Sequence, residues 1–338
     1  MASHNSRTQL LRLVNRLNQQ IRNSSFSSTN AENKAKQFHT KHFEEIQIPV
    51  PWGHIAGKWY GPKHERPLVG LHGWQDNAGT FDTLAPYLPG NMSFLALDMP
   101  GHGHSSWLPE GMQYHSMDYV VLLRRLMEEF KWDKISLMAH SMSSINSFVF
   151  TALLPDKVDM LIGLDVLKPL TRSANKIIDN YAERIEGCLK VERRIRDKTE
   201  PPCYEWDQLV ERLHTGTDKS VDMETCKFLL QRNIKPSQHE PHKYYFSRDS
   251  RLKTSLFYAF SQDVPVQMAK RINCPHLFIK ALQGPYYEKK EYYDEVLSIL
   301  KQNPKFVYHE VDGTHHVHLN EPEKVAKIIN SFLHKYKL

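Results

Sequence analysis

Six short apolar runs are spaced along the chain, and helical patterns separate most of them. Each run is rich in β-branched or aromatic residues and lacks a regular apolar–polar alternation, which is typical of strands buried on both faces. Strands of this kind that alternate with helices predict a parallel sheet covered by helices on both sides. The predicted strands are Pro67–Leu71, Phe94–Asp98, Ile135–Ala139, Met160–Asp165, His276–Ala281 and Phe306–Val311, and helices are predicted over Met117–Phe130, Asp294–Gln302 and Glu323–His334.

A largely helical and charged stretch interrupts this alternation between about Lys168 and Lys270. An excursion of about a hundred residues between two strands predicts an inserted lid over the strand ends. Its predicted elements are helices over Ser173–Arg196, Asp207–Thr215 and Ser220–Arg232 and an extended piece over His242–Leu252. The predicted organisation is an N-terminal tail (1–42), a first core part (43–167), the lid (168–270) and a second core part (271–338).

Composition excludes several classes of protein. Of the 338 residues, 40% are hydrophobic and 24% are charged, as in an ordinary globular chain. No apolar run reaches the roughly 20 residues that a membrane span needs. The net charge of +6 comes without a basic stripe interleaved with aromatic residues, so nucleic acid is not an expected partner. We expect a small-molecule substrate, and nothing indicates an oligomeric state.

The two ends of the chain carry weak targeting patterns. The first 31 residues contain four arginines, many serines and no acidic residue, which is typical of a mitochondrial targeting segment; a loosely docked helical tail is the alternative. The last three residues share only Lys337 and Leu338 with the Ser-Lys-Leu peroxisomal signal. The four cysteines form no CxxC pair and are expected to be free thiols. We therefore expect an intracellular protein, in the cytoplasm or mitochondria, with the peroxisome as a third candidate.

The segment Ala139-His140-Ser141-Met142-Ser143 follows a predicted strand and precedes a helix. A strand, a sharp turn and a helix form the setting of a nucleophile elbow, which lifts a serine hydroxyl above the sheet. The usual elbow reads Gly-x-Ser-x-Gly, whereas Ala139 and Ser143 stand in the two glycine positions here. Both are small, so the turn is feasible but tighter. Ser141 is the predicted nucleophile; an N-cap serine is the alternative.

A histidine base for Ser141 is predicted on the loop between the last strand and the last helix. Loops at the carboxyl ends of parallel strands meet at the edge of the sheet where sites form. His315 is the preferred base, because the Gly-x-His step and the spacing to Pro322 match the usual loop. His316 and His318 are the alternatives. A zinc site made of these three histidines is disfavoured, since no acidic or cysteine partner lies at a recognised ligand spacing.

The third member of a triad is an acid that orients the imidazole. Asp165 ends the strand after the nucleophile strand, one of two places where such a fold carries its acid. The other place follows the His276–Ala281 strand, where Glu288 is the nearest acidic residue. Asp165 is preferred over Glu288. Its alternative role is to cap the first turn of the lid.

An oxyanion hole needs two backbone N–H groups aimed at the developing negative charge. The first is expected from Met142, which directly follows the nucleophile. The second is expected from Trp74, which follows the His72-Gly73 step at the end of an earlier strand. His72 and Trp107 are expected to line the substrate pocket. The alternative for His72 is a structural one, in which its ring braces the loop through hydrogen bonds.

These features together resemble the α/β-hydrolase superfamily over roughly Phe43 to Leu338, and more closely the serine hydrolase-like protein family, which includes the kraken-type hydrolases of insects. The resemblance implies a lidded hydrolase without a cofactor or metal and supports Ser141, Asp165 and His315. Members usually keep glycine where this chain has Ala139 and Ser143. The segments that carry the resemblance are His72-Gly73-Trp74-x-Asp76-Asn77, Asp98-x-x-Gly101-x-Gly103-x-Ser105, Ser247-Arg248-Asp249-x-Arg251-Leu252, Phe278-Ile279-Lys280-Ala281 and His315-x-Val317-His318.

The sequence therefore predicts an α/β-hydrolase fold and a serine hydrolase that transfers an acyl group through a Ser-His-Asp triad. A carboxylic ester is the expected substrate class. The altered elbow motivates one alternative, a catalytically weak or inactive binding protein on the same fold. A haloalkane- or epoxide-type hydrolase is disfavoured, because that chemistry uses an aspartate where Ser141 stands.

Overall fold

The computed structural model describes residues 38–197, 201–258 and 260–336. The chain divides into two units, Met1–Phe38 and His39–Leu338, and the second unit carries the features below. Nearly all of the predicted N-terminal tail lies outside the described residues. So do the last two residues of the C-terminal tripeptide.

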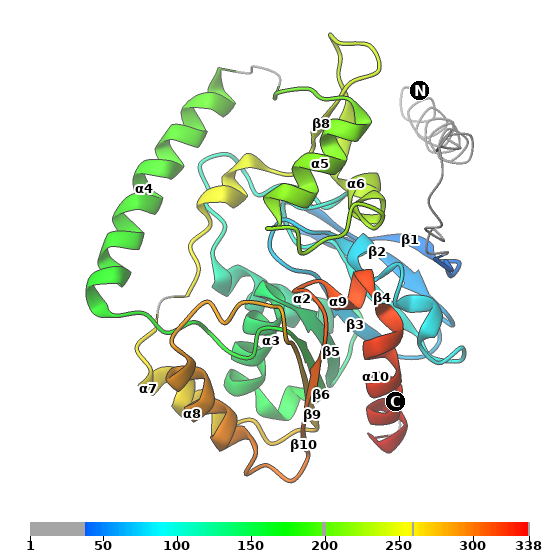
Figure 1. The fold of residues 1–338 in the computed structure, drawn as a ribbon, viewed down its shortest axis with the longest axis vertical. Coiled ribbons are helices and arrows are strands. Elements are labelled where there is room, and N and C mark those ends of the chain that lie inside the picture. Colours follow the sequence, from blue (N-terminus) through cyan, green and yellow to red (C-terminus); the bar gives the residue numbers. More distant parts are fainter. Residues whose placement is uncertain (1–37, 198–200, 259, 337–338) are drawn as a thin grey trace, which may run out of the picture. The chain divides into compact units, whose positions relative to one another are not determined.

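An eight-stranded sheet organises the second unit, with the strand order β1-β2-β4-β3-β5-β6-β9-β10 (Figure 1). Strands β1 and β2 form an antiparallel hairpin, and β2 pairs antiparallel with β4. All the other neighbours pair parallel. The predicted α/β-hydrolase fold is confirmed. The strands are β1 (Glu44–Val50), β2 (Gly53–Tyr60), β3 (Leu68–Leu71), β4 (Phe94–Leu97), β5 (Ile135–His140), β6 (Val158–Leu164), β9 (His276–Ala281) and β10 (Phe306–Val311).

Helices cover both faces of this sheet, and each face has its own hydrophobic cluster. Figure 1 shows α10 on one side of the strands and α2 and α3 on the other. The first face packs against α2 (Ser116–Glu129), α3 (Met142–Leu153), α7 (Asp263–Ala269) and α8 (Lys290–Leu300). The second face packs against two short 3-10 helices, η1 (Ala78–Phe81) and η2 (Ala85–Tyr87), and against α9 (Val317–Asn320) and α10 (Pro322–Tyr336).

The insertion between β6 and β9 is mainly helical. It contains α4 (Ala174–Arg196), α5 (Trp206–Gly216), α6 (Cys226–Asn233), a short hairpin of β7 (Ile234–Pro236) and β8 (Tyr244–Phe246), and the 3-10 helix η4 (Ser250–Thr254). Helix α6 starts later than the predicted Ser220, because tertiary contacts hold the preceding turn. The side-chain oxygen of Asn320 accepts from the Asp222 N–H and the Thr225 hydroxyl.

A buried ion pair ties the lid to the sheet. Arg232, at the end of α6, donates to both carboxylate oxygens of Asp98, which directly follows β4. Asp98 also accepts from the backbone N–H groups of Ala78 and His104. Burial alone would raise the pKa of Asp98, but the charge and hydrogen bonds of Arg232 hold that pKa well below its usual value. The motif aspartate is thus a structural anchor for the lid.

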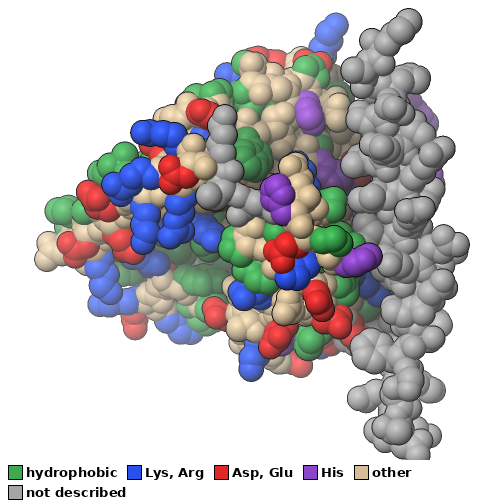
Figure 2. Space-filling view, turned by 90° about the horizontal axis from the view of Figure 1, so that it is seen from above, with side chains coloured by type: hydrophobic (Ala, Val, Ile, Leu, Met, Phe, Trp, Pro, Cys, Tyr) green, Lys and Arg blue, Asp and Glu red, His purple; other side chains and the backbone are tan. Residues whose placement is uncertain are grey.

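The exposed surface carries charges of both signs. On the face shown in Figure 2, Lys and Arg side chains lie next to Asp and Glu side chains. Such a mixture is typical of the solvated surface of a globular protein. Among the described helices, none combines the length and the apolar character required to cross a membrane. All four cysteines are free thiols.

Candidate active site

Ser141 lies in a strained turn between β5 and α3. Its backbone has φ 54° and ψ −118°, a conformation that non-glycine residues rarely adopt. Strain of this kind costs about 1–3 kcal/mol and is found mainly at functional sites. The Ser141 N–H donates to the carbonyl of Leu164 on the neighbouring strand, 3.1 Å away, which fixes the turn to the sheet. A strand, a strained residue and a helix therefore follow one another at Ser141.

The elbow tolerates both departures from the glycine pattern. Ala139 is fully buried on β5, and its register partner on β6 is Gly163. Ser143 is buried in the first turn of α3, and its hydroxyl donates to the carbonyl of His72 at 2.5 Å. The serine in the second glycine position therefore links the elbow to the loop that carries the predicted oxyanion donor at Trp74. Sequence reasoning treated this position only as a source of crowding.

His315 bridges the candidate nucleophile and the candidate acid. Its Nε2 lies 2.8 Å from the Ser141 hydroxyl oxygen, and its Nδ1 is hydrogen-bonded to Oδ2 of Asp165. Asp165 directly follows β6 and has a positive φ of 64°. Ser141 and Asp165, the two partners of His315, therefore both have strained backbone. The structure thus brings together all three predicted residues, which come from the ends of β5 and β6 and from the loop after β10. Of the alternatives, His316 and His318 make other contacts.

Asp165 has a second, buried partner that sequence reasoning missed. Lys280 on β9 donates to Oδ1 of Asp165 at 2.6 Å and to the carbonyl of Gly284 at 2.8 Å. The Ala281 N–H donates to the same carboxylate oxygen. Burial alone would raise the pKa of Asp165, but His315 and Lys280 bring that pKa below its usual value. Asp165 is therefore held as an anion, the form that stabilises a histidinium beside it.

Gly284 is a place where a side chain would disturb the acid directly. A Cβ added to Gly284 would lie 2.2 Å from Oδ2 of Asp165. For the predicted ester hydrolysis, we expect Gly284→Ala to lower kcat by about 10²-fold, the usual penalty of a 1 Å misplacement. Gly90→Ala is the matched control, because a Cβ there meets no atom within 4 Å. Steady-state kinetics of both folded variants checks this, and equal kinetics for the two variants would contradict it.

The alternative acid, Glu288, is committed elsewhere. One of its carboxylate oxygens accepts from Lys168 at 2.7 Å and from the backbone N–H of Thr171 at 2.8 Å. Both Lys168 and the Glu288 side chain are buried in this ion pair. The pair closes the start of the lid against the loop after β9. These contacts favour Asp165 over Glu288 as the partner of His315.

The two predicted oxyanion donors lie at the start of α3 and in the turn after β3. Met142 is the first residue of α3, and Trp74 lies in the turn after β3. Neither backbone N–H donates a hydrogen bond to any other described residue, so both remain available to a ligand. The Trp74 indole donates to the carbonyl of Leu252 in the lid and packs edge-on against Phe257. The Trp74 side chain therefore holds lid residues over this loop.

His72 and Trp107 differ in their surroundings. His72 is fully buried, and its Nε2 accepts from the Met99 N–H at 2.9 Å while its Nδ1 faces the carbonyl of Gly73 at 2.7 Å. Both ring nitrogens are used by the backbone, so the bracing role is favoured over a place in a substrate pocket. Trp107 is 47% exposed, and its predicted contact with substrate stays a prediction.

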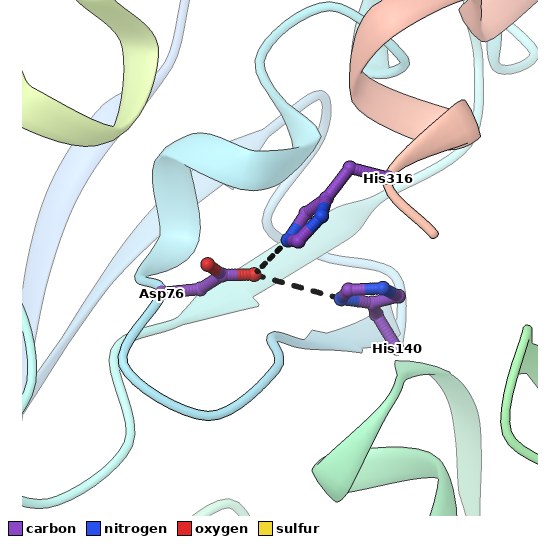
Figure 3. A group of neighbouring side chains, drawn as sticks. All are labelled: Asp76, His140 and His316. Carbon is purple, nitrogen blue, oxygen red and sulfur yellow. Dashed lines mark hydrogen bonds and ion pairs between the residues drawn. The ribbon is translucent and has the colours of Figure 1, made fainter. Parts of the chain in front are cut away.

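A second group of polar side chains lies directly behind the triad. Asp76, His140 and His316 are buried, and Figure 3 shows the two imidazoles pointing at one carboxylate. Oδ2 of Asp76 lies 3.1 Å from His316 Nε2 and 3.5 Å from His140 Nδ1. Sequence reasoning missed this group, because its members come from three segments far apart along the chain: the turn after β3, the end of β5 and the loop after β10. His318 lies apart from it in its bonding, with Nε2 2.9 Å from the Thr80 hydroxyl.

Comparisons with known proteins identify relatives of this chain. Residues 66–198 match the family model of the α/β hydrolase fold. The chain is 38% identical to a Drosophila melanogaster protein named "Probable serine hydrolase", over 86% of this chain and 88% of that one. It is 34% identical to human serine hydrolase-like protein 2, over 86% of this chain and 93% of that one.

A solved structure is also similar to this chain. The crystal structure of a hypothetical protein from Pseudomonas aeruginosa superposes with a TM-score of 0.73 at 29% identity, covering 87% of this chain and 99% of that one. The relatives match over most of their length, so the likeness includes the lid as well as the core. The chain belongs to the serine hydrolase-like family of α/β hydrolases.

Proposed function

We propose that the protein hydrolyses carboxylic esters by acyl transfer, with Ser141 as nucleophile, His315 as general base and Asp165 as the orienting acid. The observation that carries the proposal is the continuous hydrogen-bonded line from the Ser141 hydroxyl through both nitrogens of His315 to Asp165. Relatives named as serine hydrolases support the same reaction class.

The proposed reaction follows from these contacts. His315 Nε2 takes the Ser141 proton as the oxygen attacks the ester carbonyl, and the N–H groups of Met142 and Trp74 stabilise the oxyanion. The histidinium then protonates the leaving alcohol, which departs and leaves the acyl group on Ser141. Water, deprotonated by the same histidine, releases the acid. Asp165 stays ionised throughout, because Lys280 and His315 both stabilise its charge.

The alternative of an inactive binding protein was motivated by Ala139 and Ser143. Ala139 is buried within β5 opposite Gly163, and Ser143 makes a hydrogen bond that links the two loops of the proposed oxyanion hole. Neither substitution displaces Ser141 from His315. These contacts favour an active enzyme over an inactive binding protein.

The pH dependence of ester hydrolysis tests this proposal. Burial lowers the pKa of His315 below its usual value of 6.5, and the bond to Asp165 only partly opposes this effect. The base must be neutral, so kcat/KM is lost as the pH falls through that lowered pKa. With 4-nitrophenyl acetate or butyrate as substrate, we expect the midpoint of the acidic decline in kcat/KM to lie below pH 6.5. A decline with its midpoint above pH 7 would overturn the proposal. So would a folded wild type whose turnover does not exceed that of Ser141→Ala.

A further inference from the structure

In the group of Asp76, His140 and His316, three atoms with lone pairs face one another, and the neutral side chains supply no proton between them. His140 Nε2 lies 3.0 Å from the carbonyl of His315, which only accepts, so this nitrogen carries the ring proton. A neutral His140 then presents a lone pair at Nδ1. That lone pair faces the Asp76 carboxylate across 3.5 Å.

His316 is arranged in the same way. Its Nδ1 lies 2.9 Å from the Ser220 hydroxyl oxygen. That hydroxyl already donates its proton to the carbonyl of Thr217, so it accepts from His316. A neutral His316 therefore also presents a lone pair, at Nε2, to the same carboxylate oxygen at 3.1 Å. Three electron-pair donors converge, and a cation is needed to hold them together.

A proton alone satisfies only part of this arrangement. A proton on His316 Nε2 would bond to Asp76, but it would leave His140 Nδ1 unpaired. That nitrogen is buried and has no hydrogen-bond partner among the described residues. Buried polar groups without a partner are rare in folded proteins and call for a physical explanation.

A divalent metal ion satisfies all three donors. All three ligand atoms lie within 4.8 Å of one another. Ligands about 2.0–2.2 Å from a tetrahedral Zn²⁺ ion are separated by about 3.4 Å, close to the two distances from Asp76. Space is left beside them by Gly73, where a Cβ would lie 2.8 Å from His140 Nδ1 and 3.2 Å from Asp76 Oδ2.

The hydrogen bonds made by the other ring nitrogen of each histidine are also those found at metal sites. A histidine that binds a metal ion usually donates its other ring N–H to a carbonyl or another oxygen, which fixes the tautomer. His140 has the carbonyl of His315 as this partner, and His316 has the hydroxyl of Ser220. We propose that Asp76, His140 and His316 bind one divalent transition-metal ion of the zinc type.

The site lies where an ion would affect the chemistry. His140 directly precedes Ser141, and His316 directly follows His315. The rings of His140 and His315 are 4.5 Å apart. A positive ion there opposes formation of the His315 imidazolium, so Zn²⁺ should inhibit hydrolysis. This consequence rests on the proposed function, whereas binding of the ion does not.

Metal titration of the full-length protein tests the site. After treatment with a chelator, the protein should bind one equivalent of Co²⁺ with the visible absorption of a four-coordinate ion, and Zn²⁺ should displace it. Asp76→Asn and His316→Gln should each lose this signal. His309→Gln, at an exposed histidine on β10, should keep it. A signal that survives both site substitutions, or none in the wild type, would overturn the site.

X-ray absorption of the zinc-loaded wild type covers the case in which a site variant fails to fold. Two imidazole ligands and oxygen ligands are expected, and a sulfur ligand or a shell without histidine would overturn the proposal. Zn²⁺ should lower ester hydrolysis by roughly tenfold or more, because its charge repels the positive charge that the His315 ring carries during the reaction. Mg²⁺ should leave it unchanged, since it prefers oxygen ligands. Full binding without inhibition would keep the site and reject its inhibitory role.

Discussion

Ser141→Ala and His315→Gln are each expected to lower kcat for ester hydrolysis by roughly 10⁴- to 10⁶-fold. Ser141 Oγ and His315 Nε2 are 2.8 Å apart and act in one proton transfer, so the loss of either removes the same step. The double variant should therefore be no slower than the slower single variant, within a factor of about ten.

Single-turnover kinetics with an excess of enzyme measures these rates directly. His309→Gln, at an exposed histidine, is the control for a histidine substitution that leaves the site intact. Circular dichroism should show that each variant keeps the wild-type fold. Losses that multiply in the double variant would mean that the two side chains act independently, which contradicts the proposed triad.

Arg232→Met is expected to lower the free energy of unfolding by about 3–5 kcal/mol, because it leaves a buried carboxylate without its counter-charge. Asp98 is fully buried, and Arg232 is its only cationic partner among the described residues. The matched control is Glu45→Gln. Glu45 also pairs with Arg232, but its side chain is 47% exposed, so its removal should cost no more than about 1 kcal/mol. Urea denaturation at pH 7 measures both values.

The difference between wild type and Arg232→Met should also depend on pH. In the wild type the pKa of Asp98 is lowered on folding. The ion pair therefore contributes its full stability above the unfolded pKa of about 4 and loses it as the pH falls further. The difference should be largest at neutral pH and above, and it should shrink on acidification, because burial without the guanidinium raises the pKa of Asp98 in the variant and protonation removes the unpaired charge. A difference that grows on acidification, or equal effects of the two substitutions, would contradict the assigned anchor.

The strands, and the candidate site residues that follow them, could be predicted from the sequence. Buried parallel strands leave short apolar runs, and their carboxyl ends must meet at one edge of the sheet. Ser141 and Asp165 could therefore be placed near each other without coordinates. His315 followed from the loop after the last strand. The sheet order and the contact of Asp98 with the lid could not be predicted, since no local pattern encodes them.

The residues that the sequence did not reveal are those whose role depends on where the side chain points, rather than on which strand or loop carries it. Lys280 lies within an apolar strand, and nothing in its neighbours indicates that its amine reaches Asp165. The sequence pattern indicates only that Ser143 is small enough for the turn. Its hydroxyl also donates a hydrogen bond to the carbonyl of His72. The histidine-rich segment carried an available signal, because the buried side chains of His316 and His318 require polar partners. Those partners, Asp76 and Thr80, lie in the turn and the 3-10 helix after β3, more than two hundred residues away.

Reaction with a fluorophosphonate, followed by peptide mapping, tests the central claim most directly. The wild type should gain one phosphonyl group, on the peptide that contains Ser141. Ser141→Ala should gain none, and His315→Gln should react far more slowly, because its serine lacks the base that activates it. A folded wild type that does not react, or that is modified at another residue with Ser141 unmodified, would contradict the account of Ser141 as the nucleophile.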